Sequence, residues 1–308
     1  MSSLPSRAVL LCPGQGSQKP GAVATLDHDD RAVFDRASAA IGVDLWEAGL
    51  HAPAEELAKP SIVQPFLVAW AQADCDRAGR EGRTPAAVHF YMGHSSGQNS
   101  AAVLCGALPF EDGVRFAYER GLLMDRDCAA TPNTLLALAD AGRRVAEEIA
   151  AAAGCTLANY NASDQFVLGG SLDAVLEAQG VAEARAIKAV VLRVAGAFHT
   201  SYFHDSDAAA EPLIEALPLR EPFTPLIGNA WGQVIDSAAG LRDELRGQYS
   251  RPVHWVDALQ NAYDQGVRTF AVTGPGNTHA GLLRRFSLTV ADPIDVVRLN
   301  QPVAKASS

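Results

Sequence analysis

Several kinds of signal are missing from the sequence, and their absence narrows the possible functions. No apolar run reaches the ~18 residues that a membrane-spanning helix requires, and the amino-terminal residues lack the long apolar core of a signal peptide. The five cysteines lie far apart without a Cys-x-x-Cys pair, which is typical of buried thiols in a reducing compartment. Lysine and arginine number 25 against 35 acidic residues, and this net charge of −10 argues against a nucleic-acid-binding protein, which would carry a basic stripe. We expect a soluble, cytoplasmic protein that binds neither a membrane nor nucleic acid.

Signals for a metal ion or a nucleotide cofactor are also lacking. The histidines show no ligand spacing; they are His28, His51, His89, His94, His199, His204, His254 and His279. The loop Pro13–Gln18 has neither the Lys-Ser/Thr ending of a phosphate-binding loop nor the third glycine of a dinucleotide fingerprint. The sequence therefore predicts no metal and no bound cofactor. With 48% hydrophobic and 19% charged residues, the 308 residues can form one large domain or a large and a small one.

The most informative stretch that is present runs from Val88 to Ala102. A short apolar run leads into Gly93-His-Ser-Ser-Gly97, and small residues that suit a helix follow. Glycines two before and two after a serine allow a tight strand–turn–helix elbow, which holds the serine hydroxyl clear of the backbone. The amino terminus of the next helix would face an oxyanion formed there. We interpret Ser95 as a nucleophile; on these five residues alone, the alternative is a Gly/Ser-rich turn.

Two other loops follow predicted buried strands. Ala8–Cys12 is apolar and leads into Pro13–Gln18, whose amides could face a ligand; a plain strand-to-helix turn is the alternative. Lys188–Val194 is predicted to be a strand, and His199 follows it amid small residues. A loop could bring His199 to Ser95, although a histidine in such a place is more often structural.

The hydrophobic period predicts the remaining organisation. Helices are predicted at Asp30–Ile41, from Pro60 to about Ala78, at Glu111–Asp127 and at Ser250–Gln265, and the last buried strand is predicted at Phe270–Thr273. From Thr134 the period changes, and six elements are predicted: strand Thr134–Ala139, helix Arg143–Ala153, strands Thr156–Ala162 and Gln165–Gly169, helix Leu172–Ala186 and strand Lys188–Val194. This βαββαβ order is the pattern of a ferredoxin-like subdomain.

An ordered set of short motifs resembles the malonyl-CoA:acyl-carrier-protein transacylases and the acyltransferase domains of polyketide synthases. The resemblance covers nearly the whole chain. The matching pieces are, in order, Pro13–Gln18, Gln64-Pro65, Gly93–Gly97, Arg120-Gly121 with Met124, Asn159–Asn161 with the following Val-Leu-Gly-Gly, Ala197–His199, Asn229 and Gly274–Gly276. No single piece is decisive, but eight pieces in the right order are very specific.

The resemblance implies a fold and a reaction. The fold is an α/β-hydrolase-like core, here residues 1–130 and 198–308, with a ferredoxin-like small subdomain inserted at residues 131–197. The reaction is a ping-pong acyl transfer in which Ser95 attacks an acyl-CoA and His199 takes its proton. Backbone amides at Gln15 and Ser96 would bind the oxyanion, and the histidine would be oriented by main-chain carbonyls. The acyl group then passes to the phosphopantetheine thiol of an acyl carrier protein.

The resemblance also implies which residues contact the acyl group. Arg120 would pair bidentately with the free carboxylate of a malonyl group, a task that suits its planar guanidinium. Ala197-Phe198-His199 resembles the malonyl-preferring form, in which Phe198 fills the space that an α-methyl branch would need. Met124, Asn229 and His254 complete the predicted substrate-binding set.

Some positions depart from the family pattern. Ser96, Gln98 and Asn99 stand where the family usually has leucine or glutamine, then glutamate, then an aromatic residue. His254 replaces a glutamine before Trp255, either as a packing substitute or as a second titrating group. Cys128–Thr134 also differs and could reshape the acyl tunnel. These departures concern the acyl group more than the chemistry.

The expected partners are acyl-CoA and an acyl carrier protein in polyketide biosynthesis, with the protein itself a monomer. An acidic carrier helix would dock at the cleft between core and subdomain, with Lys188, Arg193, Arg284 and Arg285 as candidate contacts. Three alternatives are open. The same site could transfer acyl groups between carrier proteins or hydrolyse a stalled non-malonyl group, the chain could be a non-catalytic docking scaffold, or it could be a general serine esterase.

Overall fold

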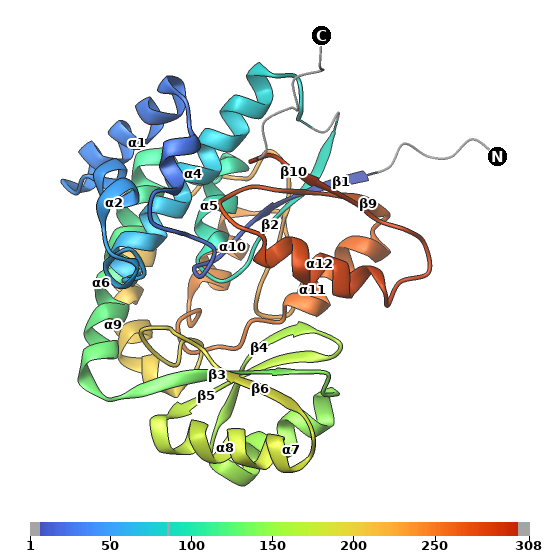
Figure 1. Ribbon diagram of the computed structural model, residues 1–308. Helices are drawn as coiled ribbons and strands as arrows, with labels where there is room; N and C mark the ends of the chain where they lie inside the picture. The colour runs from blue at the N-terminus through green and yellow to red at the C-terminus, as the bar shows by residue number, and fades with distance from the viewer. Residues whose placement is uncertain (1–6, 85–86, 301–308) are drawn as a thin grey trace.

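Two β-sheets organise the molecule, one parallel for most of its width and one antiparallel (Figure 1). The structure is a computed structural model, and it describes residues 7–84 and 87–300. The larger sheet has the order β10-β9-β1-β2-β7-β8. Neighbouring strands from β10 to β7 are parallel, and β8 pairs antiparallel with β7. Its strands are β1 (Arg7–Cys12), β2 (Val88–Gly93), β7 (Leu226–Ile227), β8 (Val234–Ile235), β9 (Val267–Val272) and β10 (Asp295–Arg298).

Strand β1 is in the interior of this sheet because its run of apolar residues can be buried on both faces. Leu10 and Cys12 pack in the same cluster as Phe34 and Phe66, on the face covered by α1 (His28–Ile41) and α4 (Pro60–Arg80). Val9 and Leu11 point the other way, toward α11 (Trp255–Asp264) and α12 (Thr278–Ser287). The remaining helices of this part are η1 (Ala22–Thr25), α2 (Leu45–His51), α3 (Ala54–Leu57), α5 (Gly97–Leu104), α6 (Phe110–Ala130), η2 (Ser201–Phe203), α9 (His204–Glu215) and α10 (Ala238–Leu245).

The smaller sheet has the order β4-β5-β3-β6, and all of its neighbouring strands are antiparallel. Its elements are β3 (Asn133–Ala139), α7 (Arg143–Ala153), β4 (Thr156–Ala162), β5 (Gln165–Ser171), α8 (Leu172–Ala184) and β6 (Lys188–Val191). Helices α7 and α8 cover the face turned away from the larger sheet (Figure 1). Alternate residues face opposite sides: Leu136 packs under these helices, whereas Leu135 belongs to the core shared with α1 and α4.

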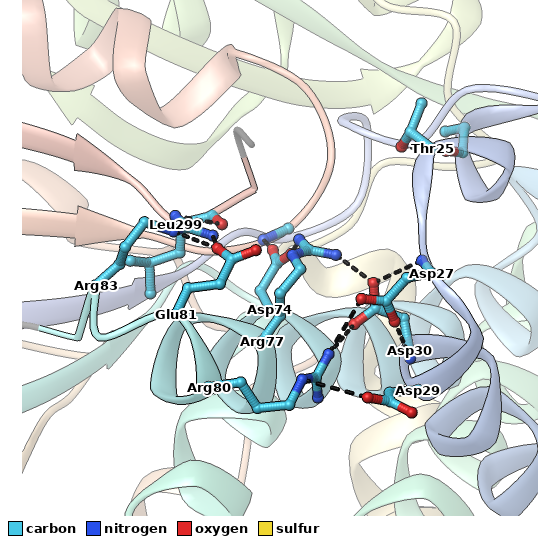
Figure 2. Close-up of polar contacts among 12 residues, drawn as sticks. Thr25, Asp27, Asp29, Asp30, Asp74, Arg77, Arg80, Glu81, Arg83 and Leu299 are labelled. Atoms are coloured by element: carbon cyan, nitrogen blue, oxygen red, sulfur yellow. Dashed lines mark hydrogen bonds and ion pairs between the residues drawn. The ribbon is translucent and has the colours of Figure 1, made fainter. Parts of the chain in front are cut away.

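A buried ionic cluster fixes α1, α4 and the loop after β9 to one another. Figure 2 shows Arg77 of α4 lying between Asp30 of α1 and Asp74 of its own helix, with an ion pair to each. The second carboxylate oxygen of Asp74 accepts a hydrogen bond of 2.7 Å from the Gly274 amide. Because Gly274 packs against Pro13, the cluster also supports the loop that follows β1.

Most of the predicted helices and strands are present in the structure, but two predictions need correction and one strand was not predicted. The helix expected over Ser250–Gln265 begins only at Trp255, because Val253 instead pairs with the edge of β4 and Pro252 cannot donate to a helix. The strand expected over Lys188–Val194 ends at Val191, and an irregular segment carries the chain on to His199. β10 follows the last buried strand as an exposed edge strand that the sequence analysis did not anticipate.

Candidate active site

The turn between β2 and α5 places Ser95 in a strained conformation. Ser95 has φ 52°, in the left-handed region that a residue with a side chain rarely adopts. The flanking glycines are required sterically. A Cβ added to Gly93 would lie 2.0 Å from the carbonyl group of Gly97, and a Cβ added to Gly97 would lie 2.2 Å from the carbonyl oxygen of Cys12. We call residues 93–97 the nucleophile elbow, because this strain holds the serine hydroxyl clear of the backbone.

His199 lies against this hydroxyl. The Nε2 atom of His199 is 2.6 Å from Ser95 Oγ, although 104 residues separate the two in the chain. On the other side of the ring, Nδ1 is 3.0 Å from the Gln248 carbonyl and 3.1 Å from the Arg251 carbonyl. Two carbonyl oxygens require a proton on Nδ1, so Nε2 is left as the acceptor that faces Ser95. Main-chain carbonyls therefore orient the imidazole, and no carboxylate among the described residues contacts it.

Burial keeps His199 neutral. The pKa of His199 is lowered from its usual value of 6.5 to about 3, first by burial and then by the positive charge of Arg120. A neutral imidazole with a free Nε2 lone pair can accept the proton of the Ser95 hydroxyl. The pair thus has the geometry and the protonation state of a nucleophile and its general base.

Backbone amides at the elbow are available to an oxyanion. Strands β1 and β2 are parallel neighbours, so the loops at their carboxyl ends meet, and a Cβ on Gly14 would lie 2.5 Å from the His94 oxygen. In residues 7–84 and 87–300, no acceptor contacts the amide of Gln15 or that of Ser96. Ser96 is also the N-cap of α5, whose dipole favours negative charge at this point.

Arg120 is a fully buried cation with unused donors. Its Nη1 atom donates to Gln64 Oε1 at 2.7 Å and contacts Met124 Sδ at 3.2 Å, and its guanidinium lies 4.8 Å from the centre of the Tyr249 ring. Nε and Nη2 are buried without a hydrogen-bond partner among the described residues, and no carboxylate pairs with the charge. We call Arg120, Gln64 and Met124 the arginine clamp. A buried cation without a partner is costly, so the clamp is suited to an anionic ligand.

The structure places the other predicted substrate contacts in three different surroundings. Phe198 is buried next to His199 and packs against Phe203, with 5.1 Å between ring centres, in the apolar cluster that also contains Met124. Asn229 instead serves the nucleophile elbow: its Oδ1 atom accepts from the Ser95 amide at 2.9 Å. The His254 ring is stacked on Tyr160, with 4.5 Å between ring centres, and a tilted Trp231 ring lies 4.9 Å from it.

The stack around His254 favours the packing interpretation of this departure from the family pattern. Its Nδ1 atom lies 3.1 Å from Asp257 Oδ2. Within the described chain, His254 makes no hydrogen bond or ring contact with Ser95, His199 or Arg120. Gln98 is another polar departure, next to the elbow. Its side-chain Oε1 accepts a hydrogen bond from Asn229 at 2.6 Å, whereas its Nε2 has no acceptor among the described residues.

The four predicted docking cations do not share one surface. Arg284 and Arg285 on α12 line a hollow together with Asp140 and Asp164, and Arg285 forms ion pairs with both of these acids. Arg193 lines a different hollow beside α4 and α6. Lys188 is exposed at the start of β6.

Comparison with known proteins identifies the family. The family model for the acyl transferase domain matches residues 9–295. The chain belongs to this family. It is 34% identical to the polyketide biosynthesis protein ThaF of Burkholderia thailandensis over 91% of this chain, which corresponds to only 24% of ThaF.

Two solved structures extend the comparison over nearly the whole acyltransferase. The malonyl-CoA:acyl carrier protein transacylase of Xanthomonas oryzae superposes with a TM-score of 0.90 at 30% identity, covering 97% of this chain and 96% of that one. A malonyl-transacylase in complex with a type II polyketide synthase acyl-carrier protein superposes with a TM-score of 0.88 at 27% identity, covering 97% of each chain. The protein is thus an acyltransferase with the α/β fold of the transacylases.

Sequence reasoning missed several residues of this acyltransferase site. Gln64 was noted only as part of a motif, whereas the structure places it on Arg120. Gln248 and Arg251 contribute through carbonyl oxygens, which no side-chain pattern reports. Within residues 7–84 and 87–300, no helix is long and apolar enough to cross a membrane, and no group of three metal-ligating side chains occurs.

Proposed function

We propose that this acyltransferase moves a malonyl group from CoA to the phosphopantetheine thiol of an acyl carrier protein, in polyketide biosynthesis. The observation that carries the proposal is the buried, unpaired guanidinium of Arg120, close enough to His199 to lower its pKa. Among common acyl groups, a dicarboxylic one supplies the missing negative charge, and a monoacyl group does not. The relatives named above support the carrier protein and the polyketide setting.

The first half-reaction follows from the geometry of Ser95 and His199. Nε2 of His199 takes the hydroxyl proton as Ser95 Oγ attacks the thioester carbonyl carbon. The C=O electron pair moves to the oxygen, and the amides of Gln15 and Ser96 would stabilise the negative charge. When the tetrahedral intermediate collapses, the C–S bond breaks and His199 returns the proton to the CoA sulfur. The product is malonyl-Ser95 and free CoA.

The arginine clamp would hold the other end of the same group. Nε and Nη2 of Arg120 lie on one edge of the guanidinium and can donate two parallel hydrogen bonds to one carboxylate. Gln64 occupies Nη1 and limits the rotation of the side chain. Phe198 would leave little room for a branch on the α-carbon, which favours malonyl over methylmalonyl by ~1–3 kcal/mol.

The second half-reaction repeats the first in reverse. The phosphopantetheine thiol gives its proton to His199, and its sulfur attacks the ester carbonyl carbon. When this tetrahedral intermediate collapses, the C–Oγ bond breaks, His199 returns the proton to Ser95 Oγ, and the malonyl group leaves as the carrier thioester. A cavity of about 960 Å³ opens beside α4 and α6; Ser61 and Asp125 line it, whereas Ser95, His199 and Arg120 do not. The phosphopantetheine arm would have to pass beyond this cavity to reach Ser95.

For the fold, we propose an α/β-hydrolase-like core, residues 1–130 and 198–308, with a ferredoxin-like subdomain at 131–197. The strand order β4-β5-β3-β6 and the chain order βαββαβ support the second part. The central parallel strands with the nucleophile elbow after β2 support the first. Chain segments on both sides of the inserted sheet contribute to the site, Ser95 before it and His199 after it.

The acylation test is intact-mass spectrometry after brief exposure of the protein to a panel of acyl-CoAs. We expect a malonyl adduct on the wild type and none on Ser95→Ala. If only monoacyl groups form adducts, or if no acyl-CoA forms one, the result would instead support the alternative of transfer between carrier proteins or hydrolysis. Equal labelling of Ser95→Ala would refute the assignment of the nucleophile.

Carrier docking can be tested separately from acylation. Arg284 is exposed on α12 without an ion pair among the described residues, next to Leu288, which is 84% exposed. We expect Arg284→Glu combined with Arg285→Glu to raise KM for the carrier protein about 10-fold without slowing acylation by malonyl-CoA, because charges at an interface rim mainly affect encounter. The same measurement on Lys188→Glu and, separately, on Arg193→Glu tests the other two candidate contacts.

The control for docking is Arg31→Glu, a charge reversal at an exposed position of α1. Helix α1 lies on the opposite side of the larger sheet from α12 (Figure 1). If all four candidate reversals left carrier-dependent turnover at the level of this control, these cations would not form the docking face.

A further inference from the structure

Asn229 is the best-connected polar residue near Ser95. Its side chain accepts from the Ser95 amide at 2.9 Å and donates to the Gly93 carbonyl at 2.8 Å and to Gln98 Oε1 at 2.6 Å. Its own carbonyl accepts from the His254 amide at 2.8 Å. Both sides of the strained Ser95 backbone are therefore tied to one amide side chain, and the position of that side chain sets the position of the nucleophile.

The backbone of Asn229 is held in turn by Glu244 on α10. One carboxylate oxygen of Glu244 accepts from the Asn229 amide and, at 3.1 Å, from the Ala230 amide. The other oxygen accepts from Gln233 Nε2 at 3.1 Å. The carboxylate of Glu244 is buried. A Cβ on Gly228 would lie 2.7 Å from it, so any larger residue at position 228 would occupy the space that the carboxylate needs.

Gln98 contacts Asn229 from the opposite side. Its oxygen is used, but its Nε2 group is fully buried and has no partner among the described residues. A carboxylate at position 98 would avoid the unpaired N–H group, but it would bring a second negative charge against Asn229, which the Glu244 carboxylate already contacts. Two buried carboxylates in contact with the same neutral residue repel each other, which is a physical reason for a neutral side chain at position 98.

We propose that Glu244 is a positioning residue for the acyl transfer, because it fixes Asn229 and through it Ser95, and that this role requires a neutral residue at Gln98. The inference rests on the proposed role of Ser95 as nucleophile. Burial raises the pKa of Glu244, and the hydrogen bonds from the Asn229 and Ala230 amides oppose this shift by stabilising the carboxylate form.

The first test measures the rate of Ser95 acylation by malonyl-CoA in Glu244→Leu. Leucine fills the space but leaves two buried amides without an acceptor, so the loop that carries Asn229 shifts. A displacement of a reacting group by ~1 Å lowers the reaction rate by about 100-fold, so we expect the acylation rate to fall 10- to 100-fold. The KM for malonyl-CoA should not change, because Arg120 is untouched. Glu244→Gln, whose carbonyl oxygen can accept from both amides, is expected within about 3-fold of the wild type.

The matched control is Asp127→Leu. Asp127 is another buried carboxylate, and it accepts two hydrogen bonds from Ser206 on α9. The melting temperature of Asp127→Leu should fall as that of Glu244→Leu does, but its acylation rate should equal that of the wild type. Wild-type acylation by Glu244→Leu, or equal slowing in Asp127→Leu or in Glu244→Gln, would overturn the positioning role. An unacylated wild type would instead refute the proposed function itself.

The second test exchanges the charges and remains informative if Glu244→Leu does not fold. We expect Gln98→Glu alone to slow acylation about 10-fold at pH 8 and to recover as the pH falls to 6, because one of the two carboxylates must then be protonated. Adding Glu244→Gln should restore acylation to within about 3-fold of the wild type at pH 8. Additive losses in the double variant, or no pH dependence in the single one, would contradict the proposal.

Discussion

Replacing Arg120 with alanine is expected to lower kcat/KM for malonyl-CoA by about 10³-fold and to leave that for acetyl-CoA unchanged or higher. The charged hydrogen bonds to the malonyl carboxylate are lost, and truncation of one partner of a buried charge pair typically costs 2–5 kcal/mol. Acetyl-CoA has no carboxylate, so in the wild type it leaves the guanidinium buried and unpaired. The measurement is the acylation rate of each variant with both CoA esters.

Two variants sharpen this experiment. Arg120→Lys keeps the charge but loses the planar pair of donors, so an intermediate rate is expected. Arg115→Ala removes an exposed arginine from the same helix, where it forms an ion pair with Asp112, and should change neither rate. Intact malonyl loading in Arg120→Ala would disprove the arginine clamp.

Replacing His199 with alanine is expected to lower the acylation rate about 10⁴-fold, with the amount of folded protein unchanged. Nothing else contacts the Ser95 hydroxyl in the described part of the chain, so the proton has no other acceptor there. His204→Ala is the control, because this histidine is exposed at the start of α9, five positions along. Equal rates in the two variants would exclude His199 as the base.

The pH profile of the wild type gives a second readout of the same residue. The active form of His199 is neutral, and its lowered pKa of about 3 means that it stays neutral well below the usual 6.5. The acidic limb of kcat/KM for acylation is therefore expected far below pH 6.5, and it should be absent from His199→Ala. A limb at 6.5 would show that the imidazole is exposed to water in the working enzyme.

Local signals were sufficient for the elements that the chain builds from neighbouring residues. The apolar run before Pro13 predicted β1, and the glycines around Ser95 predicted the turn after β2, because close packing and backbone strain leave a mark in the residues themselves. Ser250–Pro252 was assigned to a helix in error. The competing pairing of Val253 with β4 involves a strand nearly 100 residues earlier, which no local pattern reports.

The candidate site divides in the same way. The sequence alone determined which residues have reactive chemistry, since Ser95, His199 and Arg120 stand in motifs whose residue types serve that chemistry directly. Only the tertiary structure decided what those residues experience. Burial makes His199 neutral, and two distant carbonyls set its tautomer. Arg120 is buried without a counter-ion among the described residues, which suits it to an anionic ligand.

The physical reason for this division is that charge, tautomer and strain depend on what surrounds a group rather than on its covalent identity. Asn229 illustrates it: the sequence placed it among the substrate contacts, whereas its hydrogen bonds to the Ser95 amide and to Gln98 make it a support for the nucleophile elbow. Glu244 carried no signal in the sequence, because its partners are backbone amides that only the fold brings within reach.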